Sequence, residues 1–130
     1  MSDELYVLTL NKEQALLTRD ALELYARLKI GQFNRITELM LDVRDVKDYC
    51  ERRDTINDLF RVIAGLFFGR NTYGQPDCKK DAEHHRAWNI YTALRYQIAW
   101  HDNPKGGIGC CYDEPRPWGG EPVPRCEIIT

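Results

Sequence analysis

The amino-acid sequence predicts a mainly α-helical single domain over residues 1–130, with about four bundle-like helices and a small C-terminal β-hairpin. Three observations lead to this prediction. Apolar residues recur along much of the chain at the three- and four-residue spacing of a helix face. Capping residues, glycine and proline mark the ends of these segments. After Gly107 the pattern changes to the alternation that is typical of strands.

The N-terminal part is predicted to contain a short strand and two helices. Residues 5–10 are rich in strand-forming side chains and stop at Asn11, which forms a capping-box pattern with Gln14. A helix is expected from residue 12 to about residue 30, because Gly31 favours a helix end. A second helix follows almost at once. The apolar faces of the two helices comprise Leu17, Ala21, Leu24 and Leu28, then Phe33, Ile36, Met40 and Val43.

Two further helices are predicted in the middle of the chain. The third is expected to begin at Thr55 and to end at Gly69, and the charge-dense residues 42–54 before it either extend a helix or break it. The fourth and longest begins after Asp77 or Asp81, since either carboxylate can cap it. It ends at Asn103, because the residue before a proline avoids the α region. Its apolar face comprises Ala87, Tyr91, Leu94 and Ile98.

The C-terminal part is predicted to form a β-hairpin. Residues 108–112 alternate in character, residues 113–122 are rich in proline and glycine, and residues 125–129 form a second candidate strand. The sequence leaves open whether residues 5–10 join this hairpin or pair with another subunit.

Composition and charge exclude several classes of protein. A formal net charge of −2 argues against coating an extended nucleic acid, which demands a basic surface. No apolar run approaches the roughly 20 residues that span a bilayer, and the N-terminus lacks the features of a signal peptide. The five cysteines are odd in number and irregularly spaced. They are therefore expected to be reduced thiols in the cytoplasm.

Several short motifs follow one another in the C-terminal half. They are Trp88-Asn89-Ile90-Tyr91, a W-x-x-N-P-x-G-G segment from Trp100 to Gly107, Tyr112-Asp113-Glu114-Pro115, and Glu121-Pro122. This order resembles a group of small uncharacterised accessory proteins carried by tailed bacteriophages and prophages. The resemblance implies a viral origin and a place in the host cytosol. It implies no reaction and no catalytic residues.

Metal and catalytic sites have weak support in the sequence. Cys78, His84, His85, Cys110, Cys111 and Cys126 are candidate metal ligands, but they form neither a C-x-x-C nor an H-x-x-x-H pair. A metal-dependent phosphohydrolase would use His84, His101 and Asp102, although a helix end explains the last two equally well. The acidic residues between 42 and 54 alternate with basic ones, as on a solvated helix face. We therefore expect no metal, no cofactor and no catalytic residue.

A binding function fits the residue types better. Arg70, Asn71 and Tyr73 in a loop, with Arg86, Asn89 and Arg95 on the fourth helix, could bind a small anionic nucleotide. The main hypothesis is thus a phage accessory protein that sequesters a host immune nucleotide signal. The alternative is an inhibitor that binds a host protein through Trp118 and Arg116, because exposed Trp and Arg are typical of interface hot spots. Excess apolar surface on the third helix, at Leu66 and Phe68, predicts a homo-oligomer.

Overall fold

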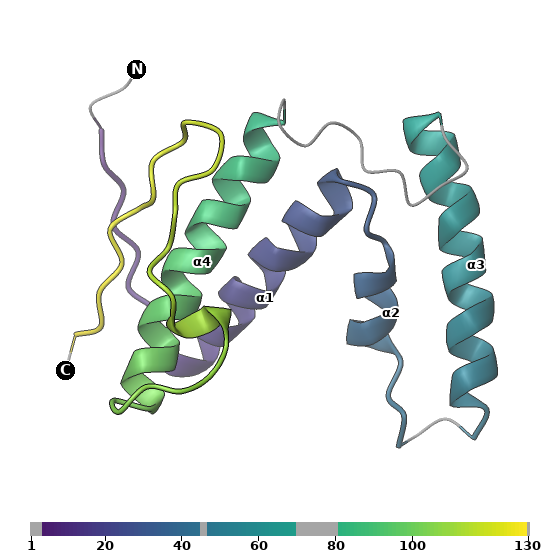
Figure 1. Ribbon diagram of the computed structural model, residues 1–130, viewed down its shortest axis with the longest axis horizontal. Coiled ribbons are helices and arrows are strands. Elements are labelled where there is room, and N and C mark those ends of the chain that lie inside the picture. Colours follow the sequence, from purple (N-terminus) through teal and green to yellow (C-terminus); the bar gives the residue numbers. More distant parts are fainter. Residues whose placement is uncertain (1–3, 45–46, 70–80, 130) are drawn as a thin grey trace.

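A computed structural model of the chain describes residues 4–44, 47–69 and 81–129. These residues form four α-helices and one 3-10 turn (Figure 1). The helices are α1 (Lys12–Lys29), α2 (Asn34–Met40), α3 (Tyr49–Phe68) and α4 (Ala82–Asp102), and η2 (Cys110–Tyr112) follows α4. The prediction of a mainly helical chain is confirmed. In the described residues, no helix is long and apolar enough to cross a membrane.

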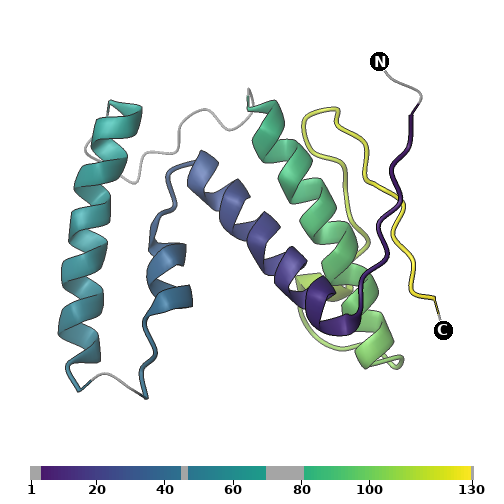
Figure 2. The same cartoon turned by 180° about the vertical axis from the view of Figure 1, so that it is seen from behind.

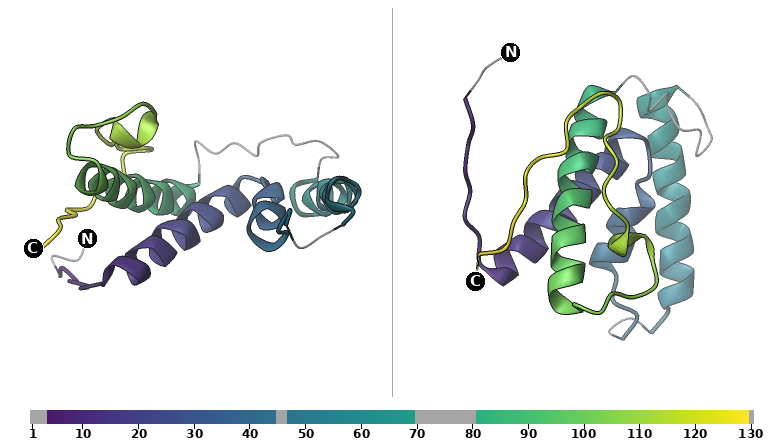
Figure 3. Two further views of the ribbon diagram at one scale, coloured as in Figure 1. Left: turned by 90° about the horizontal axis from the view of Figure 1, so that it is seen from below. Right: turned by 60° about the vertical axis from the view of Figure 1, so that its left-hand side comes forward.

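The core of the molecule is the α1–α4 pair, whose helices lie side by side in opposite views (Figures 1 and 2). The C-terminal segment runs along the other side of α4, so α4 lies between it and α1 (Figure 3). This position explains why α4 contains most of the buried residues. They are Ala87, Tyr91, Ala93 and Ile98 together with the polar His84, His85, Asn89 and Thr92.

Capping interactions hold the ends of α1. Asn11 and Gln14 form the predicted capping box at its start. At its end, the last carbonyls need partners from outside the helix. The His84 ring on α4 provides one, because its Nδ1 lies 2.7 Å from the carbonyl oxygen of the fully buried Ala26 and must donate to it. The cap of α1 therefore also joins α1 to α4.

Helices α2 and α3 form a separate arm. Phe33 at the start of α2 stacks on Phe60 of α3 and contacts the rings of Phe67 and Phe68. The hydroxyl of the buried Thr37 donates to Asn57 Oδ1 at 2.8 Å. Among the described residues, α3 packs mainly on α2 and stands apart from the α1–α4 pair (Figures 1 and 3). The four helices therefore form two pairs instead of one four-helix bundle.

The third helix begins earlier than predicted. It starts at Tyr49 and not at Thr55, so the second half of the charge-dense segment is helical. The charged side chains at this end face solvent, and the Arg53 guanidinium lies over the Tyr49 ring. Helix α2 ends at Met40, before this segment, and the described residues 42–44 and 47–48 are not helical.

The predicted β-hairpin is wrong for the residues that the structure describes. Residues 108–112 contain the turn η2 instead of a strand, because Gly109 adopts a φ of 126° and redirects the chain. Residues 122–129 are extended, but no backbone hydrogen bond joins them to another described segment. Their two prolines lack the N–H donor that strand pairing requires. The described residues 5–10 have no regular secondary structure, and none of them forms a backbone hydrogen bond with another described segment.

Candidate functional site

The most elaborate polar site surrounds a loop of the C-terminal segment, residues 115–121, which we call the strap. The strap crosses the face of α4 that points away from α1 (Figures 1 and 3). It is rich in proline and glycine and has no regular secondary structure. Its position therefore depends on contacts with side chains of α4.

Asn89 is the central contact of the strap. Its side chain is fully buried, yet every polar atom of its amide has a partner. The Nδ2 group donates to the carbonyl oxygens of Trp118 at 3.3 Å and Glu121 at 3.1 Å. The backbone N–H of Trp118 donates to Asn89 Oδ1 at 2.9 Å. One amide thus binds both backbone polar groups of Trp118.

A tight turn follows Trp118 and brings the strap against the helix. Gly119 and Gly120 both have positive φ angles, 62° and 79°, and Glu121 N–H donates to the Trp118 carbonyl at 3.1 Å. A Cβ added at Gly119 would lie 1.9 Å from Nδ1 of His85, whereas one added at Gly120 would meet no atom within 4 Å. Position 119 therefore requires glycine both for its conformation and for its close approach to α4.

An ion pair closes the far end of the strap. Arg86 donates to both carboxylate oxygens of Glu121, at 3.2 Å from Nε and 2.8 Å from Nη2. This fork-like hydrogen bonding lowers the pKa of Glu121 and keeps the carboxylate charged. The Arg86 side chain is 59% exposed, so the ion pair contributes little to stability. Its main effect is to fix the position of Glu121 relative to α4.

The segment before the strap is held by an aromatic contact at the other end of α4. Trp100 Nε1 donates to the carbonyl oxygen of Tyr112 at 3.1 Å, and the two rings meet edge to face. Gly106 and Gly107 allow this packing, because a Cβ at either position would fall within 3 Å of the Trp100 or Tyr112 ring. The W-x-x-N-P-x-G-G segment therefore has a structural role here.

The strap presents two side chains to solvent. Trp118 is 49% exposed although both of its backbone polar groups are bound, and Arg116 is exposed two residues earlier. A half-exposed indole whose backbone is hydrogen-bonded to α4 offers apolar area and an N–H donor. Arg116 adds a planar, permanently charged donor beside it. This combination suits the recognition of another macromolecule.

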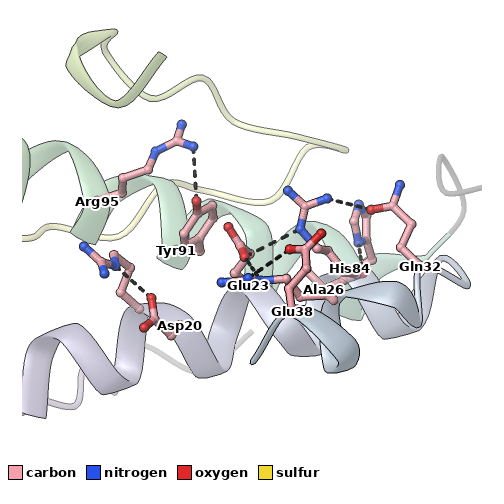
Figure 4. Close-up of polar contacts among 11 residues, drawn as sticks. Asp20, Glu23, Ala26, Gln32, Glu38, His84, Tyr91 and Arg95 are labelled. Carbon is pink, nitrogen blue, oxygen red and sulfur yellow. Dashed lines mark hydrogen bonds and ion pairs between the residues drawn. The ribbon is translucent and has the colours of Figure 1, made fainter. Parts of the chain in front are cut away.

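A second polar cluster lies between α1, α2 and α4 (Figure 4). Glu23 accepts from Arg35 Nε at 2.6 Å and lies 3.6 Å from Arg27 Nε. Burial raises the pKa of Glu23, but the Tyr91 hydroxyl and the two guanidinium groups outweigh this effect, and the pKa falls below its ordinary value. Tyr91 also accepts from Arg95 at 3.2 Å. Among the described residues, the buried Nε atoms of Arg27 and Arg95 have no hydrogen-bond partner. Through the Glu23–Arg35 ion pair the cluster joins the α2–α3 arm to the core.

No protein-family model, no curated protein and no solved structure matches the chain.

The residues of the predicted nucleotide site do not all lie together. Arg86 and Asn89 face the strap, where Glu121 and the strap backbone occupy their polar atoms. Arg95 lies nine residues after Arg86, which places it on the opposite side of α4 at ~100° per residue. Its guanidinium stacks over the Tyr91 ring. Arg70, Asn71 and Tyr73 lie outside the described residues.

The candidate metal and catalytic residues are also dispersed. His84 and His85 are buried against α1 and the strap, whereas His101 is exposed about 25 Å further along α4, at ~1.5 Å per residue. Asp102 forms an ion pair with Lys12. No group of three or more metal-ligand residues occurs in the parts of the chain that the structure describes. Cys78 lies outside these parts. Burial raises the pKa of Cys126, which favours its thiol form.

The structural roles of Asn89 and His85 were not predicted from the sequence. The available signal was the placement of polar residues on helix positions that become buried, together with a downstream Trp-Gly-Gly segment. Asparagine lowers helix stability slightly, so an asparagine in the middle of a long helix suggests a specific partner.

Proposed function

We propose that the protein acts by binding a partner protein through the strap, with Trp118 and Arg116 as the contact residues. One observation carries this proposal. The backbone N–H and carbonyl of Trp118 are both hydrogen-bonded to the fully buried Asn89, while the indole is half exposed. A buried hydrogen-bond network thus fixes the backbone of a residue whose apolar side chain is exposed.

The physical advantage of this arrangement is preorganisation. A flexible loop loses conformational entropy when it binds, and this cost lowers its affinity. The strap is already ordered by Asn89, the Gly119 turn and the Arg86–Glu121 pair. Trp and Arg are among the residue types most enriched in interface hot spots. The ordered backbone and these two residue types together support a binding surface at the strap.

The partner in this proposal is a host protein, in keeping with the resemblance to phage accessory proteins. Cytoplasmic location in an infected bacterium belongs to the same proposal. Nucleotide sequestration and metal-dependent phosphohydrolysis stay predictions. A thermal-unfolding panel of nucleotides and divalent metals tests both, since a ligand of the folded state raises the melting temperature.

The direct test compares capture by the wild type, Trp118→Ala and Leu17→Ala in lysates of the host bacterium. Leu17 is the control, because it is an exposed apolar residue on α1, away from the strap. Truncation of a hot-spot tryptophan costs about 2–4 kcal/mol, or roughly 30- to 1,000-fold in the dissociation constant. We expect Trp118→Ala to lose a protein that the other two retain. Equal capture by all three would refute the proposal.

A further inference from the structure

The outer face of α3 is a second surface, independent of the strap. Opposite the side that packs on α2, a stripe of apolar residues runs along the helix at alternating spacings of four and three. Leu59, Val62 and Leu66 form its centre and are 59%, 55% and 81% exposed. Ile63 flanks the stripe at 37% exposure, and the exposed Thr55 continues it by one turn. Phe67 is also exposed but lies on the side of α3 that faces α2, where its ring contacts Phe33.

The stripe is comparable with the largest apolar patch of a typical monomer, and patches of this size are often functional. Leu59, Val62, Ile63 and Leu66 present on the order of 400 Å² per copy, which lies within the roughly 300–600 Å² of the largest patch on a typical monomer. A standard interface buries about 800 Å² per partner, so the apolar stripe supplies about half of the area that a specific dimer needs and the polar residues at its margins must supply the rest. Among the described residues, no other part of the chain covers it.

The spacing of the stripe also matches its own copy. Alternating steps of three and four residues form the a/d seam of a two-helix coiled coil. If two copies pair in opposite directions about a two-fold axis between residues 60 and 61, Leu59 meets the partner's Val62. In the same register, Leu66 meets the partner's Thr55. Every position of the stripe then has a counterpart, as a two-fold interface requires.

The charges on α3 favour this direction over the parallel one. Asp54 and Asp58 are 66% and 71% exposed near the N-terminal half of the stripe. A parallel pair would place each carboxylate beside its own copy, where like charges repel. The antiparallel pair separates the two copies of Asp54 by about 20 Å along the axis and those of Asp58 by about 8 Å, at ~1.5 Å per residue.

We propose that α3 is a homodimerisation helix and that a second copy of this chain, packed antiparallel through Leu59, Val62 and Leu66, covers its outer face. The proposal goes beyond partner recognition by the strap, because the two surfaces share no residue. A dimer carries two straps and therefore binds a multivalent partner with an avidity that a monomer lacks.

The test is the molar mass in solution, measured by light scattering and sedimentation, of the wild type and three variants. Leu66→Glu places a carboxylate in the seam, which opposes association. Adding Thr55→Lys to it places the introduced lysine opposite the partner's introduced glutamate, in the antiparallel register only. Leu17→Glu on α1 is the control, because Leu17 is 70% exposed outside the stripe. Thermal unfolding of each variant verifies that it is folded.

We expect a wild-type mass of twice 15.2 kDa, monomeric Leu66→Glu, dimeric Leu17→Glu and a dimer restored by the double variant. A monomeric wild type at its highest soluble concentration would overturn the proposal, as would a dimer that Leu66→Glu leaves intact. Failure of the double variant to restore the dimer would overturn the antiparallel register. Partner capture by the monomeric variants reports on the strap separately, so the two proposals fail in distinguishable ways.

Discussion

Replacement of Asn89 by alanine removes the contact on which the position of the strap depends. The substitution deletes three hydrogen bonds, two donated to strap carbonyls and one accepted from the Trp118 N–H. A typical hydrogen bond contributes about 0.5–1.5 kcal/mol net, and buried groups left without partners cost more. We therefore expect Asn89→Ala to lower the free energy of unfolding by about 2–4 kcal/mol.

Two measurements check this prediction. Denaturant unfolding gives the loss of stability, and hydrogen exchange gives the protection of the Trp118 amide, which donates to Asn89. Gln97→Ala is the matched control. Gln97 also has an amide side chain and lies on α4, but among the described residues this side chain has no hydrogen-bond partner. We expect this control to change stability by no more than about 0.5 kcal/mol. Equal stability of the two variants, with unchanged exchange at Trp118, would refute the role given to Asn89.

Two further predictions concern the strap turn and the charged cluster. Gly119→Ala is expected to destabilise the fold by about 1–3 kcal/mol more than Gly120→Ala, because both positions have positive φ but only the former collides with His85; equal unfolding midpoints would contradict this. The pKa of Glu23 lies below its unfolded value of 4.5, so its contribution is present above that pH and is lost as the pH falls through the folded pKa. Glu23→Gln should therefore remove part of the stability difference between neutral and acidic pH, and an unchanged pH dependence of unfolding would count against the cluster with Arg35.

Local signals predicted the helices well where capping residues mark their ends. Asn11 and Gln14 form the predicted capping box at the start of α1. Asp81, one of the two predicted caps, lies at the start of α4, and Asn103 lies at its end as expected. These features act within a few residues of the chain, so the sequence alone reveals them. The start of α3 was misplaced because its first turns are charged on nearly every side and show no apolar period.

The role of the strap depends on contacts between distant parts of the chain. Asn89 meets backbone groups 29 and 32 residues further on, and His85 meets Gly119. Backbone acceptors carry no sequence signature, so nothing near Asn89 identified its partners. The hairpin was predicted from alternation alone, but the φ of Gly109 and the prolines of the last segment exclude regular pairing. The separation of α3 from the α1–α4 pair is likewise a matter of tertiary packing.

The most direct test of strap-mediated binding is site-specific photo-crosslinking in the host bacterium. A photoreactive residue replaces Arg116, and a second protein with the same residue at Arg125 is the control, because Arg125 is 86% exposed outside the strap. We predict a discrete adduct from position 116 that is absent from position 125 and disappears when Trp118→Ala or Asn89→Ala is added. An adduct pattern at position 116 that neither substitution changes would contradict the binding role of the strap.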